Sequence, residues 1–293
     1  MTATRLIATV ITVLLGGALA LAGSAGGQRL GTLPLFALAV GVAFLIQWLA
    51  FVPAYLKQTE RFFDLTGALT YIAVTVGILA SARPADARAW LLAALIVAWA
   101  VRLGTFLAWR VHRFGGDRRF EDIKPSASRF FFTWTLQGLW VSVTASAAWV
   151  AITSTGRAPL GVFAWAGTTL WLVGFVLEVV ADAQKTAFKS RSENAGRFIH
   201  TGLWSRSRHP NYAGEILLWV GIAVIAWPNL SGWGLIGLVS PVFVALLLTR
   251  VSGIPMLEAK ADKTWGGQSA YEQYKAQTPL LIPAFGSRPQ LEE

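Results

Sequence analysis

The chain has 293 residues, of which 55% are hydrophobic and only 14% charged, and its formal net charge is +10. Soluble domains carry about 25% charged residues, so this composition excludes soluble and disordered proteins and predicts an all-α, polytopic membrane bundle. The absence of cysteine excludes disulfides, thiolate metal sites and cysteine nucleophiles. Three histidines are too few for a histidine-rich di-iron oxygenase, so we expect no metal.

Eight apolar stretches follow one another along the chain, and the first six are each near the ~20 residues that cross a bilayer. They cover residues 6–22, 33–56, 64–82, 88–108, 130–152, 160–181, 212–228 and 233–250. The first could be a signal peptide, since Arg5 precedes its apolar run, but its length and the seven spans that follow favour a membrane helix. We therefore expect about 7–8 transmembrane helices, with an additional N-terminal helix in 1–32 and a single membrane domain in 33–293.

Lysines and arginines are distributed unevenly between the two sides of this predicted bundle. Twenty of the 25 lie near the termini and in the loops of one side, whereas Arg29, Arg83, Arg88 and Arg157 lie on the other. Because basic residues accumulate on the cytoplasmic side, both termini and the long loops are predicted to be cytoplasmic. This clustering indicates membrane lipid or an anionic cofactor as a partner, and no basic stripe with exposed aromatics supports nucleic acid.

Two carboxylates lie at the start of the third apolar stretch or just before it. Asp64 stands between Phe63 and Leu65, and apolar neighbours should favour its protonated form, which can donate a hydrogen bond or a proton. Glu60 precedes it by four residues, and we expect it on the same helix face. Charged residues inside membrane spans are functional candidates by default.

A line of charges ends the sixth stretch. Glu178, Asp182, Lys185 and Lys189 are separated by four, three and four residues, so they share one helix face from the membrane to its cytoplasmic boundary. The line is either a salt-bridge ladder at a helix end or the wall of a polar cleft.

An Arg-His-Pro-Asn-Tyr-Ala-Gly-Glu motif, residues 208–215, opens the seventh stretch. Its proline suits the first turn of a helix, and Asn211 and Glu215 share a face. Arg206, Arg208 and His209 crowd the N-terminus of that helix, which attracts anions, so the motif predicts a phosphate site at the membrane surface. Either arginine alone is equally explained as a cytoplasmic anchor.

The segment after the last stretch contains Lys260 and Tyr271 and ends in an apolar tail at Pro283. Such a segment folds back as a lid or remains a solvated amphipathic tail. The G-x-G-x-x-G pattern of residues 232–237 follows no strand, so we interpret it as a glycine cluster of a helical hairpin.

The motif at 208–215 resembles the membrane steroid 5α-reductase and sterol reductase family, most closely its bacterial branch, DUF1295. The similarity extends from about Lys57 to Phe285. It implies an NADPH-dependent reductase of the C=C bond in an apolar conjugated enone, such as a 3-oxo-Δ4-steroid. It also implies one reductase domain with cytoplasmic cofactor-binding loops and a C-terminal lid, in the bacterial inner membrane.

This resemblance also implies roles for single residues. The cofactor-binding positions correspond to Glu178, Asp182, Lys189, Arg197, Asn211 and Glu215. We add Arg208, His209, Lys260 and Tyr271 from the motifs above. The carbonyl-polarising acid corresponds to Asp64, or less well to Glu60; the family's tyrosine position lies near Trp99, with Tyr71 as a substitute.

Two other functions compete with the reductase. Isoprenylcysteine carboxyl methyltransferases carry a similar Arg-His-Pro-x-Tyr-x-Gly run and bind S-adenosylmethionine. Asn211 and Glu215 favour the reductase, as do the cations at 185–208, because that cofactor is itself cationic. A transporter would use intramembrane charges such as Asp64 and Arg102, but no inverted repeat supports one.

Overall fold

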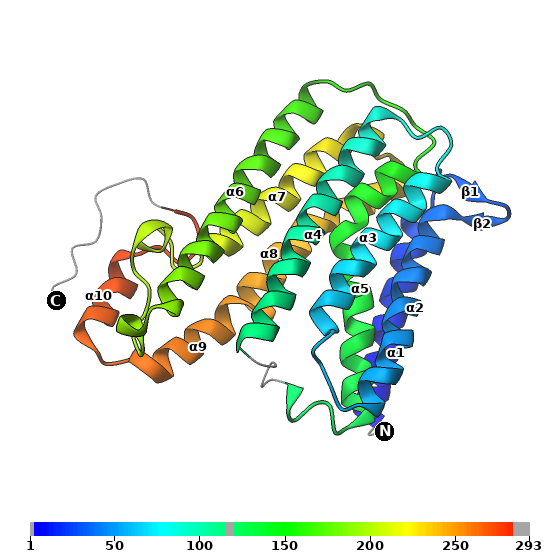
Figure 1. Cartoon of the computed structure of the whole chain (residues 1–293). Helices are drawn as coiled ribbons and strands as arrows, with labels where there is room; N and C mark the ends of the chain where they lie inside the picture. Colours follow the sequence, from blue (N-terminus) through cyan, green and yellow to red (C-terminus); the bar gives the residue numbers. More distant parts are fainter. Residues whose placement is uncertain (1–2, 115–119, 284–293) are drawn as a thin grey trace. The chain divides into compact units, whose positions relative to one another are not determined.

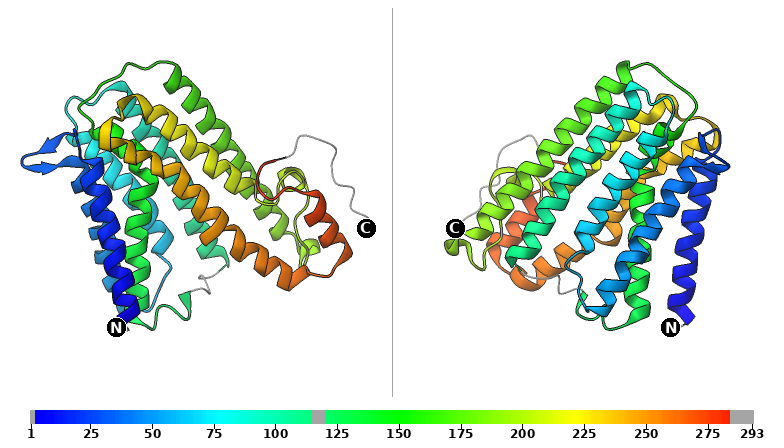
Figure 2. Two further views of the ribbon diagram at one scale, coloured as in Figure 1. Left: turned by 180° about the vertical axis from the view of Figure 1, so that it is seen from behind. Right: turned by 45° about the vertical axis from the view of Figure 1, so that its right-hand side comes forward.

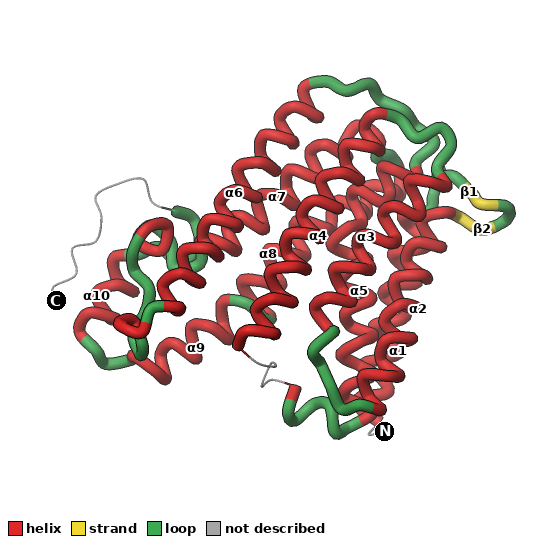
Figure 3. The backbone as a smooth tube through the Cα atoms, viewed as in Figure 1, coloured by secondary structure: helices red, strands yellow, loops and turns green. Residues whose placement is uncertain are grey.

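The computed structural model describes residues 3–114 and 120–283, most of which are helical (Figures 1 and 3). The α-helices are α1 (Ala3–Gly23), α2 (Leu35–Leu56), α3 (Phe63–Ser81), α4 (Ala87–Phe114), α5 (Ala127–Thr153), α6 (Val162–Ser190), α7 (Pro210–Ala226), α8 (Val239–Leu246), α9 (Ile254–Trp265) and α10 (Ser269–Gln277). A π-helical turn, Leu247–Val251, continues α8. In the described ranges the only sheet is an antiparallel hairpin of β1 (Arg29–Leu30) and β2 (Leu33–Pro34).

Eight described segments are long and apolar enough to cross a membrane, in agreement with the eight predicted stretches. The prediction of a polytopic helical membrane bundle is therefore confirmed. The first of them is the continuous helix α1. The division into an additional helix at 1–32 and one reductase domain at 33–293 stays a prediction.

The chain forms two compact units. Unit 1 comprises Met1–Trp165 and Ile222–Ser240, and unit 2 comprises Ala166–Gly221 and Pro241–Glu293. The expected catalytic residues belong to unit 1, and the expected cofactor-binding residues all belong to unit 2.

Helix α5 forms the centre of unit 1 and packs against α1, α2, α3 and α4 (Figure 2). Its Trp134 and Trp149 are among the largest fully buried side chains. Polar side chains inside the unit bond to one another: Trp149 Nε1 donates to Thr75 Oγ1 at 2.9 Å, and Gln47 Nε2 donates to Thr70 Oγ1 at 2.7 Å. Pairing of this kind removes much of the cost of burying polar groups among membrane helices.

Arg88, which the sequence placed among the loop charges, is in fact only 2% exposed. Its guanidinium donates to the carbonyl oxygens of Ile225, at 2.5 Å, and Pro159, at 2.7 Å. Ile225 is in the last turn of α7, where carbonyls lack helical partners. Arg88 therefore provides a hydrogen-bond donor for a carbonyl group at the C-terminal end of α7.

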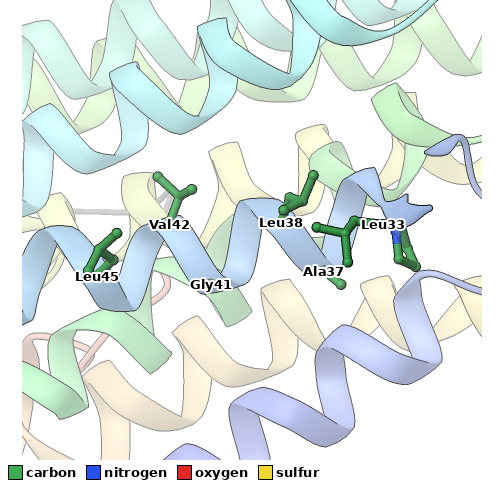
Figure 4. A pocket seen from close by; sticks show the side chains of 7 residues that line it. Leu33, Ala37, Leu38, Gly41, Val42 and Leu45 are labelled. Carbon is green, nitrogen blue, oxygen red and sulfur yellow. The ribbon is translucent and has the colours of Figure 1, made fainter. Parts of the chain in front are cut away.

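An apolar groove of about 250 Å³ runs along α2 (Figure 4). It is lined by Leu33, Pro34, Ala37, Leu38, Gly41, Val42 and Leu45. None of these side chains carries a polar atom, so the groove offers no group for chemistry.

In unit 2, glycines bring α6 and α7 close together. A Cβ added at Gly174 would lie 2.5 Å from the carbonyl oxygen of Gly214, and a Cβ at Gly214 would lie 2.5 Å from that of Gly174. A Cβ at Gly221 would likewise lie 2.6 Å from the oxygen of Gly167. Small residues permit this approach of two membrane helices. Gly214, a member of the 208–215 motif, is thus required for packing.

Candidate functional site

A cavity of about 190 Å³, here called the unit 2 cavity, is formed by the end of α6, the loop between α6 and α7, and helices α9 and α10. Six of the ten expected cofactor residues line it: Lys189, Arg197, Arg208, His209, Lys260 and Tyr271. The other lining residues are Lys185, Phe188, Phe198, Ile199, Trp204, Leu257, Glu258, Ala261, Thr264, Trp265 and Tyr274.

The charges of this lining are strongly unbalanced. Five lining side chains are lysine or arginine, whereas Glu258 is the single carboxylate among them. A concave site with one sign of charge concentrates ions of the other sign. The cavity therefore favours an anion, and guanidinium and ammonium groups are the usual partners of phosphate.

The cavity wall depends on a turn at Gly202. This residue has a left-handed φ of +63°, and a Cβ there would lie 2.6 Å from Gln184 Oε1. The same oxygen accepts a hydrogen bond from the backbone N–H of Leu203 at 2.9 Å. Trp204 follows, buried, with its indole donating to the carbonyl of Ala181 and the Lys185 ammonium 4.3 Å from its ring centre. The Gly202-Leu203 pair thus fixes Trp204 in the wall.

The C-terminal segment folds back onto the loop between α6 and α7. Of the two alternatives left by the sequence, a segment that folds back or a solvated tail, the structure shows the first. Tyr274 donates its hydroxyl proton to the carbonyl of Trp204 at 2.7 Å, and Ser207 Oγ donates to the carbonyl of Leu281 at 2.7 Å. Burial raises the pKa of Tyr274, so its hydroxyl remains a donor. Whether the segment opens and closes as a lid stays a prediction.

Aromatic rings form another part of the wall. The Phe198 ring lies 5.3 Å from that of Tyr271 and 5.9 Å from that of Trp265, both measured between ring centres. Trp265 also donates its indole hydrogen to the carbonyl of Gly196 at 2.6 Å. These contacts hold the α6–α7 loop against α9 and α10.

Glu258, which was not among the expected site residues, organises the motif at the start of α7. Its Oε2 accepts from Arg208 at 2.5 Å, and its Oε1 lies 2.7 Å from His209 Nε2. His209 is 4% exposed, and this burial lowers its pKa, although the bond to Glu258 acts in the opposite direction. Because Glu258 follows His209 by 49 residues, no local spacing could have revealed the pair.

The charged face of α6 divides into two parts. Lys185 and Lys189 line the cavity, whereas Glu178 and Asp182 are buried and are not part of its lining. Asp182 Oδ1 accepts a hydrogen bond from Asn211 Nδ2 at 3.2 Å. Glu215 also lies outside the lining. The structure therefore gathers six of the expected cofactor residues at the cavity, and the other four on α6 and α7.

Two expectations about the acids of unit 1 are corrected. Glu60 is not on the helix face of Asp64: the chain turns at Gln58, whose φ is 48°, and α3 begins only at Phe63. Glu60 instead accepts from Lys124 at 2.9 Å. Asp64 is not isolated among apolar groups, because its carboxylate is 36% exposed and lies 3.9 Å from Arg110.

Tyr71 contacts Trp99, the residue near which the family's tyrosine position was expected. It is buried on α3, and its ring contacts that of Trp99 on α4 edge-to-face, with 5.2 Å between ring centres. Asp64 precedes Tyr71 by seven residues on the same helix, which corresponds to two turns, or about 10 Å along the axis.

The unit 2 cavity fits part of a phosphorylated dinucleotide. Its cations suit phosphate and its rings suit a planar base, while Arg208 Nε and His209 Nδ1 are buried polar atoms with no hydrogen-bond partner among the described residues. Its volume is below the 300–1,000 Å³ typical of small-molecule sites, so it has room for only one portion of such a ligand. In the described ranges, no three His, Asp or Glu residues are grouped so as to hold a metal ion.

A family described as a protein of unknown function (DUF1295) matches residues 50–278 of the chain. The 3-oxo-5-alpha-steroid 4-dehydrogenase 1 of Rattus norvegicus is 30% identical over 118 residues, which is 40% of either chain. A steroid 5-alpha-reductase of Gossypium hirsutum is 27% identical over 118 residues, or 40% of this chain and 41% of the relative.

An uncharacterised protein of Schizosaccharomyces pombe is 28% identical over 183 residues, or 51% of this chain and 52% of the relative. The chain thus spans about half the length, or less, of these curated relatives. No solved structure matches it significantly.

Proposed function

The chain belongs to the DUF1295 family, and from this premise we propose that it is a membrane reductase. It uses NADPH to reduce the C=C bond of an apolar conjugated enone, such as a 3-oxo-Δ4-steroid. The names of the rat and cotton relatives support this reaction. The observation that carries the proposal is the unit 2 cavity, in which five cations and several aromatic rings meet.

Binding of the cofactor is assigned to unit 2. Lys189, Arg197 and Lys260 contribute positive charge to the cavity and hold phosphate, with Arg197 able to bind two oxygens at once. The Asp182–Asn211 pair offers carboxylate and amide groups for ribose or nicotinamide. NADPH would supply the hydride.

Polarisation of the substrate carbonyl is assigned to an acid of unit 1. A protonated carboxyl group that donates a hydrogen bond to the carbonyl oxygen stabilises negative charge as it develops there. Asp64 is proposed ahead of Glu60, as the family resemblance implies, and Glu60 is already engaged by Lys124 at 2.9 Å. Tyr71 is proposed as the substitute for the family's tyrosine, which donates a second hydrogen bond to the same carbonyl.

The proposed location is the bacterial inner membrane, with both termini and the unit 2 cavity on the cytoplasmic side, where NADPH is available. The excess of lysine and arginine near the termini and in the loops of one side supports this orientation. The substrate, being apolar, would come from the membrane.

The cofactor assignment is tested by titrating the purified protein with NADPH. Replacement of Arg197 by Ala removes a charge-assisted contact, so we expect affinity to decrease by about 10-fold or more. Arg191→Ala is the matched control, because Arg191 is exposed, lies outside the cavity lining and faces Glu193 at 3.8 Å. Equal affinities for all three proteins would contradict the assignment, and binding of S-adenosylmethionine in place of NADPH would favour a methyltransferase.

A further inference from the structure

His209 is held on two sides at the edge of the unit 2 cavity. Its Nε2 lies 2.7 Å from Glu258 Oε1, and its ring stacks on that of Tyr212 with 5.7 Å between centres and 9° between planes. The backbone N–H of His209 donates to Ser207 Oγ at 3.1 Å. The imidazole therefore has one defined orientation.

These contacts also determine which ring nitrogen carries the proton. Burial keeps the imidazole neutral by lowering its pKa, so one nitrogen donates and the other accepts. Glu258, ionised opposite Arg208, can only accept, and Nε2 must therefore hold the hydrogen. Nδ1 is left as an acceptor, and it is buried with no hydrogen-bond partner among the described residues.

We propose that His209 is a specificity-determining residue whose Nδ1 accepts a hydrogen bond from a hydroxyl or amide N–H group of the ligand in the unit 2 cavity. This inference rests on the proposed function and adds to it the kind of ligand group that His209 recognises. It also reverses the role expected from the sequence, where His209 belonged to a phosphate site. A phosphate oxygen without a proton cannot satisfy an acceptor.

Arg208 strengthens the argument, because its buried Nε is a donor with no hydrogen-bond partner among the described residues. Two consecutive residues of the lining thus each hold a buried polar atom without a partner among the described residues, a donor in Arg208 and an acceptor in His209. A hydroxyl or a primary amide group can both donate and accept hydrogen bonds. NADPH carries both kinds of group, in its riboses and in its carboxamide.

Glu258 acts on the ligand through His209 and is a positioning residue. An uncharged amide at position 258 could donate to Nε2, which would move the imidazole hydrogen to Nδ1 and turn the acceptor into a donor. The structure thus assigns to Glu258 the choice of tautomer, in addition to its bond with Arg208.

Two substitutions of His209 distinguish the contributions of its two ring nitrogens to ligand binding. Gln in place of His can keep a donor near the position of Nε2 and loses Nδ1, whereas Asn can keep an acceptor near the position of Nδ1 and loses the bond to Glu258. His112→Gln is the matched control, since His112 is exposed on α4. We expect His209→Gln to weaken NADPH binding by about 5- to 10-fold and His209→Asn to weaken it less.

The outcomes distinguish this inference from the proposed function. If wild type and His209→Gln bind NADPH equally, the inference is overturned while the proposed function stands, and water satisfies Nδ1. If His209→Asn loses as much affinity as His209→Gln, the effect comes from the bond to Glu258, which also overturns it. If wild type does not bind NADPH at all, both fail.

An NADPH analogue with an acetyl group in place of the carboxamide identifies the ligand group. If the carboxamide is recognised, His209→Gln loses little affinity for this analogue; if a ribose hydroxyl is recognised, it loses as much as for NADPH. The tautomer is observed directly by ¹⁵N NMR of labelled histidine, of which the chain has three. Wild type should show hydrogen on Nε2 of His209 and Glu258→Gln should show it on Nδ1; hydrogen on Nδ1 in wild type would overturn the inference.

Discussion

At the scale of single residues, Glu258 changes what the Arg-His pair of the motif can do. Sequence alone suggests two more positive groups for phosphate, but Arg208 is already bonded to a carboxylate and His209 is buried and neutral. The attraction for an anion therefore comes from the other cations of the cavity lining, which are Lys185, Lys189, Arg197 and Lys260. His209 is left to recognise a group that donates a hydrogen bond.

Burial of His209 predicts how stability depends on pH. Its folded-state pKa is below the ordinary 6.5, so the unfolded chain takes up the proton first as pH decreases. Its contribution is therefore fully present above about pH 6.5 and is lost as pH falls through the folded-state pKa. The charged groups facing it are Glu258, which favours protonation, and Arg208 and Lys185, which oppose it.

The measurement is the thermal unfolding temperature across this pH range. Wild type should lose stability toward acid more steeply than His209→Gln, which has no imidazole to protonate. Identical slopes for the two proteins would contradict the burial argument.

Asp64, the proposed carbonyl-polarising acid, can be tested by substitution. An amide is a much weaker acid than a carboxylic acid, and a positioned acid contributes about 10² or more in rate, so Asp64→Asn should reduce turnover by that order. NADPH affinity should not change. Asp122→Asn, at an exposed position before α5, is the control. Turnover equal to wild type would remove Asp64 from the reaction.

At the scale of elements, the packing of α6 on α7 positions the site. The glycine contacts let the face that carries Asp182 approach the start of α7, where Asn211 bonds to it. Membrane helices gain little from burying apolar surface against each other, so close van der Waals contact between them matters more.

This close packing predicts that one methyl group added at Gly214 will clearly reduce the stability of the protein. In Gly214→Ala, the Cβ would lie 2.5 Å from the oxygen of Gly174, and the helices must separate. Overpacking of this kind costs about 1–3 kcal/mol, so the unfolding temperature in detergent should decrease clearly. The control is Gly77→Ala on α3, where nothing lies within 4 Å of the added carbon. Equal stability of the two variants would contradict the close approach.

At the scale of the whole molecule, the spans were predictable because length and apolar composition decide which segments cross a membrane. The face of α6 was predictable because spacings of three and four residues are local. Contacts between segments that are far apart in the sequence were not predictable. The Arg208–Glu258 bond joins residues 50 apart, and the burial of Arg88 depends on the end of α7. Glu60 was misplaced because α3 begins only at Phe63, so Glu60 lies before the helix that carries Asp64.

The orientation in the membrane is a further whole-molecule prediction, and the natural absence of cysteine makes it direct to test. Thr32→Cys places a thiol in the β1–β2 turn, and Ser192→Cys places one at an exposed position after α6. A membrane-impermeant maleimide should label the first variant in intact cells and the second only after lysis. The reverse pattern would place the unit 2 cavity outside the cytoplasm.

The proposed reductase activity is measured as oxidation of NADPH by the detergent-purified protein, with and without a 3-oxo-Δ4-steroid. The proposal predicts NADPH consumption that depends on the enone and yields a product with the C=C bond reduced. Asp64→Asn serves as the low-activity reference. Absence of NADPH binding and of turnover, together with binding of S-adenosylmethionine, would contradict the reductase proposal.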